Sequence, residues 1–271
     1  MNFIKKHPSV LLQPFVKNFW IIEVLPEDLP FSQLYFPYGA FELICYLENR
    51  GIMQYIGDEE FFHQPRLFYS GQFTKPFKLS FDKPCKCIGV SFHPWAGNVL
   101  YNIPSNVFTD KMIELGDLNK SDILIRQDLS LENDEKIFKA LENYVLEKVK
   151  SVEVDAVSTF IAQFVIKSPI RNDVNQALSQ IGLSKRRIEQ RFLASTGLSI
   201  GAFTRKIRFQ KAVSLVQTLH NTSLTQIGYE AGYFDQSHFI SEFKSFTAIS
   251  PLAFSKQNSA LKNFISSLVV S

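Results

Sequence analysis

The sequence predicts an α+β protein: an N-terminal antiparallel β-sandwich or barrel-like module, then an all-α domain with two helix-turn-helix units joined by a long helix. Up to about residue 118, short runs rich in Phe, Tyr, Ile and Val alternate with Pro and Gly. Beyond residue 132, apolar residues recur every three or four positions. In addition, the stretch 182–203 returns in altered form 51 residues later. With 271 residues, 45% of them apolar, the chain can form two packed domains.

The N-terminal module is expected to consist of six short strands. Each candidate strand is rich in aromatic and β-branched residues, and turn signals such as Pro37–Gly39, Gly57-Asp58 and Lys83-Pro84 lie between them. The six runs span residues 15–25, 41–50, 52–57, 67–73, 77–81 and 87–93. No long amphipathic helix interrupts them, which favours an antiparallel sandwich or a small barrel.

A barrel of this kind can enclose a small ligand. Four aromatic or polar residues of the module are candidates to line such a site: Tyr38, Glu42, His93 and Trp95. The same residues would also serve as packing aromatics and turn residues in a barrel without a ligand. Both interpretations stay open on the sequence alone.

The histidines of the module do not form a metal-binding pattern. His7, His63 and His93 are widely separated, whereas a metal-binding double-stranded barrel normally has two histidines one residue apart with a glutamate soon after. The module also lacks a Gly-rich phosphate loop and a nucleophile elbow. These absences argue against an enzyme.

Three cysteines, Cys45, Cys85 and Cys87, are too few for a disulfide framework. The C-x-C spacing of Cys85 and Cys87 differs from the usual spacing of zinc ligands. Two cysteines at alternate positions of a strand, one of them facing inward, explain the pattern better. The sequence therefore predicts no bound metal and no cofactor.

A helical connector is expected over residues 131–168. Apolar residues at helical spacing predict one amphipathic helix from Glu132 onward and a second over residues 152–167. These helices can pack on the β module or pair with a second subunit, and packing within the chain is the simpler arrangement. Ser168-Pro169 then marks a domain boundary, because the residue before a proline is disfavoured in the α conformation.

The first helix-turn-helix unit is expected to begin with a helix over residues 173–181. Gly182 follows at the turn, where a positive φ is expected, and Ser184 can cap the next helix through its hydroxyl. Gly197 is the expected C-terminal cap. The helix that follows this turn, residues 184–196, is the expected recognition helix.

The side chains of this recognition helix divide into two faces. Ile188 and Phe192 lie four positions apart and face the core. The outward residues are Lys185, Arg186, Glu189 and Gln190. Arg can bind guanine O6 and N7, Gln can bind adenine N6 and N7, and Glu can accept a hydrogen bond from cytosine N4, so this face suits the major groove of DNA.

A long helix over residues 199–219 and a second unit follow. The long helix is expected to bury residues such as Phe203, Ile207 and Val216, and to expose Arg205, Lys206, Arg208 and Lys211. In the second unit Gly232 forms the turn and Asp235 caps the recognition helix 235–246, while Gly228 lies inside the preceding helix. The outward residues of this helix are Gln236, Ser237, His238 and Ser241.

Charge is unevenly distributed along the chain. The formal net charge is only +3, but between Ile170 and Gln257 there are 11 basic and five acidic residues, which leaves −3 for the remainder. A basic C-terminal third of this kind is typical of a part that contacts phosphates, although a solvated basic face has the same composition.

The run IGYEAGYFDQSHFISEFKSFTAISP, residues 227–251, resembles the signature of AraC/XylS-type transcriptional regulators, and the similarity extends over residues 170–257. The resemblance implies two recognition helices in successive major grooves of DNA, about 34–36 Å apart. Carried over by position, the base-reading residues are Arg186, Glu189, Gln190, Gln236, Ser237 and Ser241. Two departures stand out: Ala248 replaces the usual glycine, and Phe254-Ser255 replaces the usual aromatic-arginine pair.

These observations together predict a sequence-specific DNA-binding transcriptional regulator, not an enzyme. The expected domains are 1–130 for sensing or dimerisation, 131–168 as connector, 169–258 for DNA binding and 259–271 as a tail. The alternative is an enzyme or small-molecule-binding protein fused to an AraC-type domain. The expected DNA-binding residues are Lys185, Arg186, Arg187, Glu189, Gln190, Arg191, Arg205, Gln236, Ser237, His238 and Ser241.

The expected partner is double-stranded DNA, with RNA polymerase, a small effector and a second copy of the chain as further candidates. The N-terminus lacks the apolar core of a secretory signal, and no apolar run approaches the roughly 20 residues that span a bilayer. A cytoplasmic location is therefore expected.

Overall fold

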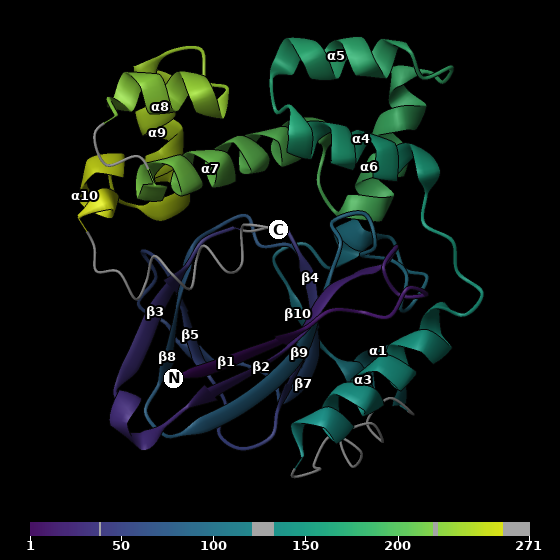
Figure 1. The fold of residues 1–271 in the computed structure, drawn as a ribbon, viewed down its shortest axis with the longest axis vertical. Helices are drawn as coiled ribbons and strands as arrows, with labels where there is room; N and C mark the ends of the chain where they lie inside the picture. Colours follow the sequence, from purple (N-terminus) through teal and green to yellow (C-terminus); the bar gives the residue numbers. More distant parts are fainter. Residues whose placement is uncertain (38, 121–132, 219–221, 257–271) are drawn as a thin grey trace.

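The computed structural model describes residues 1–37, 39–120, 133–218 and 222–256. It confirms the α+β fold class: two antiparallel sheets form the N-terminal module, and a layer of helices lies along one side of it (Figure 1). The six strands expected from the sequence are all present.

The larger sheet has six antiparallel strands. In spatial order they are β1 (Asn2–Lys6), β2 (Val16–Val24), β9 (Cys85–Phe92), β4 (Phe41–Tyr46), β7 (Leu67–Ser70) and β10 (Met112–Glu114). Its central strands are buried on both faces, so β4 and β9 have nearly continuous apolar sequences instead of an alternating pattern.

The smaller sheet has four strands and faces the larger one. Their order is β3 (Phe31–Tyr35), β8 (Phe77–Phe81), β5 (Ile52–Tyr55) and β6 (Phe62–His63). The described part of the module also contains three short helices: η1 (Pro26–Asp28), η2 (Ser105–Val107) and α1 (Leu115–Leu118).

The space between the sheets contains aromatic side chains and two of the cysteines. Cys85 and Cys87 are both buried in this cluster, 3% and 5% exposed. The expectation that only one of them faces inward was wrong, because residues two apart on a strand share a face. Cys45 is buried on the opposite face of the larger sheet, and none of the three cysteines forms a disulfide bond.

The two connector helices pack within the chain, as expected. Helix α3 (Asp134–Val149) is capped by Asn133 and buries Ile137 and Leu141 in the cluster on the outer face of the larger sheet. Helix α4 (Ala156–Lys167) is capped by Asp155 and instead packs beside α5 and α6 (Figure 1).

The remaining helices form two units at the two ends of one long helix, α7, which connects them (Figure 1). They are α5 (Arg171–Ser179), α6 (Lys185–Thr196), α7 (Ile200–Thr218), α8 (Leu224–Ala231), α9 (Gln236–Thr247) and α10 (Pro251–Ser255). The apolar core of the first unit is continuous with that of the β module, whereas the second unit has a separate cluster, which Phe36 of the β module joins. Among the described residues, no helix combines the length and hydropathy needed to cross a membrane.

Candidate functional site

Local capping signals position the first candidate recognition helix, α6. The Ser184 hydroxyl accepts a hydrogen bond from the Arg187 amide at 3.4 Å, and Gly197 ends the helix in the left-handed conformation with a φ of 75°. Ile188 and Phe192 are buried, and the Phe192 ring packs edge-on against Phe203 of α7 at 5.5 Å. These expectations were correct.

The expected positive φ at Gly182 was wrong. Left-handed glycines among the described residues are Gly57, Gly197 and Gly232. Helix α5 ends in a tight 3-10-like turn, in which the amides of Gln180 and Ile181 donate to the carbonyls three positions earlier. This turn therefore contains no residue with a positive φ, whereas the turn of the second unit has a left-handed glycine, Gly232, with a φ of 95°.

The outward face of α6 presents most of the expected DNA-binding residues to solvent. Lys185, Arg186, Arg187 and Gln190 are exposed. Two others are engaged within the protein: a Glu189 carboxylate oxygen accepts from the Ile200 amide at the start of α7, and the Arg191 guanidinium forms an ion pair with Asp155. The free basic surface of this helix is thus concentrated in its first turn.

The second candidate recognition helix, α9, is built by the same kind of signals. The Asp235 carboxylate accepts from the His238 amide at 2.7 Å, and Phe239, Phe243 and Phe246 lie in the core of the unit. The four expected outward residues, Gln236, Ser237, His238 and Ser241, are all exposed. Gln236 also accepts a hydrogen bond from the Thr225 hydroxyl of α8 at 2.7 Å.

Ala248 ends α9 in the left-handed conformation with a φ of 62°. This position corresponds to Gly197 at the end of α6, and a Cβ is present here as the sequence indicates. Alanine in this conformation is strained relative to glycine, since its Cβ approaches the following carbonyl oxygen.

Helix α7 is more deeply buried than the sequence suggests. Lys206 was expected to be exposed, but it is 2% exposed, because α7 packs against helices and against the β module as well. Arg205 is about half exposed, and its guanidinium lies 2.7 Å from Glu242, a buried residue of α9. Arg208 contacts the other oxygen of Glu242 at 3.6 Å, so one carboxylate connects α7 to the second recognition helix.

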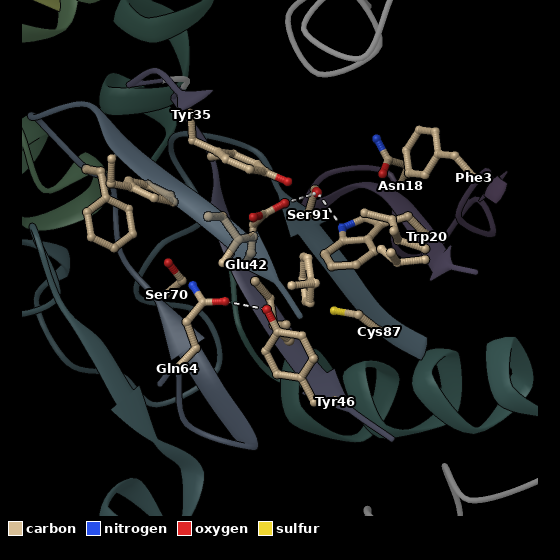
Figure 2. A pocket seen from close by; sticks show the side chains of 18 of the residues that line it. Phe3, Asn18, Trp20, Tyr35, Glu42, Tyr46, Gln64, Ser70, Cys87 and Ser91 are labelled. Carbon is tan, nitrogen blue, oxygen red and sulfur yellow. Dashed lines mark hydrogen bonds between the residues drawn. The ribbon is translucent and has the colours of Figure 1, made fainter. Parts of the chain in front are cut away.

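A cavity lies between the two sheets of the N-terminal module. Its wall is largely aromatic and aliphatic, with polar groups at separate places. Figure 2 shows one chain of hydrogen bonds, in which Trp20 donates to the Ser91 hydroxyl at 3.0 Å and Ser91 donates to Glu42 at 2.8 Å. Opposite, the Tyr46 hydroxyl donates to the Gln64 side-chain oxygen (Figure 2). Burial raises the pKa of Tyr46, which keeps its hydroxyl neutral.

Of the residues expected to line a ligand site, Glu42 lines this cavity. His93 and Trp95 do not: their rings stack on each other at 4.5 Å, and their side chains contact the carbonyls of Gln13 and Pro14. Burial lowers the pKa of His93 to about 4, which suits a neutral packing residue. Tyr38 lies outside the described residues.

Lys17 lines the same cavity as Glu42. Its pKa is lowered, first by burial and then by the charge of Lys5, while the charge of Glu42 acts in the opposite direction. Among the described residues, no group of His, Cys, Asp and Glu side chains is arranged to hold a metal ion.

The β module contacts the C-terminal end of α6 through three side chains. The hydroxyls of Ser105 and Thr109 donate to the carbonyls of Ser195 and Gly197, each at 2.7 Å. The carbonyl between them, that of Thr196, accepts from the Gln72 amide at 2.7 Å. The last carbonyls of a helix lack hydrogen-bond donors within the helix, and here side chains of the β module supply those donors.

Phe36 makes the corresponding contact with the second unit. It follows β3 in the chain and lines the cavity, yet its ring lies in the core of the second unit, 6.2 Å from Phe209 and 5.5 Å from Phe254. Gln72 and Phe36 were not identified from the sequence, because an isolated Gln or Phe in a strand-rich region carries no local signal of a distant contact.

Two parts of the chain match known sequence families. Residues 178–257 match a family described as "Helix-turn-helix domain", and residues 5–114 match one described as "Domain of unknown function (DUF6597)". No curated protein sequence is significantly similar to the chain.

Solved structures with a similar arrangement include two of ToxT from Vibrio cholerae. A structure in crystal form P21 is 12% identical, with a TM-score of 0.44, and the match covers 100% of both chains. A structure with a bound unsaturated fatty acid is 15% identical, with a TM-score of 0.42, over 87% of this chain and 93% of that one.

A third similar structure is the C-terminal domain of AraT, a response regulator from Geobacillus stearothermophilus. It is 20% identical, with a TM-score of 0.36, over 38% of this chain and 87% of that one.

The segment that matches the helix-turn-helix family contains both capped recognition helices and the long helix between them. The C-terminal part of this chain is therefore a helix-turn-helix domain of the AraC type, the DNA-binding domain of a transcriptional regulator.

Proposed function

We propose that the protein regulates transcription by reading two successive major grooves with α6 and α9, under the control of a small ligand in the N-terminal cavity. The observation that carries the proposal is the pair of capped, outward-facing helices joined by the buried helix α7. A rigid connection of this kind presents both helices to one DNA molecule at a constant spacing.

The exposed residues of the two helices divide into base-reading and phosphate-binding groups in this proposal. Arg186 and Gln190 of α6, and Gln236, Ser237 and Ser241 of α9, read base edges. The phosphate contacts come from the neighbouring basic residues Lys185 and Arg187, with His238 adding a hydrogen bond. Glu189, Arg191 and Arg205 hold the domain together in the DNA-free form, and would contribute to binding only after exchanging those partners.

Ligand control has a direct physical route in this structure. The cavity wall includes Phe36, Ser70 and Gly71. Phe36 continues into the core of the second unit, and Gln72, which follows Gly71, holds the end of α6. A ligand that moves these wall residues changes the contacts of both helix-turn-helix units together, which is the differential interaction that allosteric control needs.

The remaining parts of the proposal follow from this role. Residues 1–130 sense the ligand, 131–168 connect and 169–258 bind DNA; the expected tail, 259–271, lies outside the described residues. The protein acts in the cytoplasm, where it meets DNA and RNA polymerase, as one copy or two, and it catalyses no reaction.

The test is selection of binding sites from random double-stranded DNA by the purified full-length protein, with and without a pool of metabolites. We expect enrichment of one site containing two half-sites about one helical turn apart, and a steep fall of affinity with salt. A metabolite fraction should change the affinity for that site. Absence of any enriched site, or an affinity independent of salt, would contradict DNA binding, whereas a site indifferent to every metabolite would contradict only ligand control.

A further inference from the structure

Phe234 is 87% exposed and lies at the entrance to the second recognition helix. It directly precedes Asp235, the residue that caps α9. An aromatic side chain this exposed stands out beside the N-terminal residues of a recognition helix, which in a helix-turn-helix unit contact base edges.

The usual structural role of an apolar residue at this position is absent here. The residue before a helix cap commonly packs on the fourth residue of the helix, which in α9 is Phe239. That contact is made instead by Tyr233, whose ring lies 5.3 Å from Phe239 and which is only 3% exposed. The fold of the second unit therefore does not use the Phe234 ring.

The first unit differs at the equivalent position. Leu183 precedes the cap Ser184, as Phe234 precedes Asp235, and Leu183 is partly buried against the core. Exposure of the residue before the cap thus distinguishes the second unit from the first.

The neighbouring surface indicates what Phe234 contacts. Gln236 and Ser237, two exposed residues of the first turn, carry uncharged polar side chains that are suited to base edges. Among the four bases only thymine presents a methyl group in the major groove, and Phe is one of the side chains that contact it.

We propose that Phe234 contacts the C5-methyl group of a thymine in the major groove, and so makes the second unit prefer a T·A pair at one position. This inference rests on the proposed DNA-binding function and adds a specificity-determining residue to it. It also supplies an apolar contact to a recognition helix whose outward residues are otherwise all polar.

The experiment removes the methyl group without altering base pairing. In the DNA site selected by the full-length protein, each thymidine of the half-site read by the second unit is replaced in turn by deoxyuridine. For the wild type we expect affinity to fall roughly three- to tenfold at one position, as expected for loss of one buried methyl group. The Phe234→Ala variant should bind thymidine and deoxyuridine equally well there, and Phe234→Leu should keep part of the preference.

Leu252→Ala is the matched control, because Leu252 is another exposed apolar residue of the same unit, 54% exposed on α10, outside the recognition helix. It should retain the full methyl dependence. Thermal unfolding checks that Phe234→Ala folds normally, as expected for an exposed side chain.

Two results would overturn the inference: equal affinity of the wild type for thymidine and deoxyuridine at every position, or a methyl dependence that persists in Phe234→Ala. Both leave the proposed function intact, because a DNA site has then been selected. Failure to select any site would instead remove the proposed function and this inference with it.

Discussion

Gln72 and Thr196 are 124 positions apart in the chain, yet the Gln72 side-chain nitrogen lies 2.7 Å from the Thr196 carbonyl oxygen at the end of α6. The side-chain oxygen of Gln72 accepts from the Lys206 ammonium group at 3.0 Å. One fully buried amide thus joins the β module to a recognition helix and to the long helix that follows it.

Replacement of Gln72 by Met keeps the side-chain volume but removes both hydrogen bonds. Because the Thr196 carbonyl and Lys206 lose a buried partner, we expect the free energy of unfolding to fall by about 2–3 kcal/mol. Amide hydrogen exchange at the end of α6 should accelerate. Gln54→Met is the control, since Gln54 bonds to a carbonyl at an exposed turn, and it should change stability by less than about 0.5 kcal/mol. Equal effects of the two variants would refute this role of Gln72.

The lowered pKa of Lys206 predicts that the free energy of unfolding rises with pH. Burial lowers its pKa to about 7, against a partial opposing effect of Asp110, whereas in the unfolded chain its pKa is near 10.5. Between these values the unfolded state binds the proton and the folded state does not, so stability increases as the pH rises. Denaturant titrations should give a gain of about 2 kcal/mol from pH 7 to pH 9 in the wild type relative to Lys206→Met.

The control for this titration is Lys211→Met, which removes an exposed lysine from the same helix. It should keep the pH dependence of the wild type. The same profile in Lys206→Met and the wild type would show that Lys206 is not the titrating group.

Ala248 and Gly197 provide an opposed pair of substitutions at equivalent helix ends. Ala248→Gly should raise the free energy of unfolding by about 1 kcal/mol, because it relieves a left-handed residue that is exposed and leaves no cavity. Gly197→Ala should lower it by about 1–2 kcal/mol through the same strain. There a Cβ would also come within 2.9 Å of the Thr109 hydroxyl. Effects of the same sign, measured by thermal unfolding, would contradict this account.

Arg186→Ala should weaken binding to the selected DNA site by about 1–3 kcal/mol and relax the preference at one base pair. The reason is loss of a forked contact with a base edge, not loss of charge alone. Lys139→Ala is the control, because it removes a positive charge from the exposed face of the connector helix α3, outside the helix-turn-helix units. Binding measured against all four bases at each position distinguishes lost specificity from a uniform loss of affinity.

Features set by neighbouring residues could be predicted from the sequence. The caps Ser184 and Asp235 and the glycine end of α6 are local signals, and the structure confirms them. The strands β1, β3, β6 and β10 were missed, since they are short or lack a buried face in their own sequence, and pairing partners define them.

Features that depend on packing could not be predicted in the same way. Lys206 reads as solvent-exposed because helical periodicity assumes one buried face, whereas α7 is surrounded on several sides. Glu42 was identified as a cavity residue, but the contacts of Phe36 and Gln72 arise only when residues far apart in the chain are brought together.

Phe36 makes the second helix-turn-helix unit dependent on a residue that is synthesised well before it. Without the β module, helices α7 to α10 would lose the Phe36 ring that packs against Phe209 and Phe254, and an apolar surface would be uncovered there. During synthesis the N-terminal module can fold first, so that the Phe36 side chain is already in place when the last helices fold and pack against it. A fragment containing those helices alone would expose this surface to water, and self-association through it is the expected fate of such a fragment.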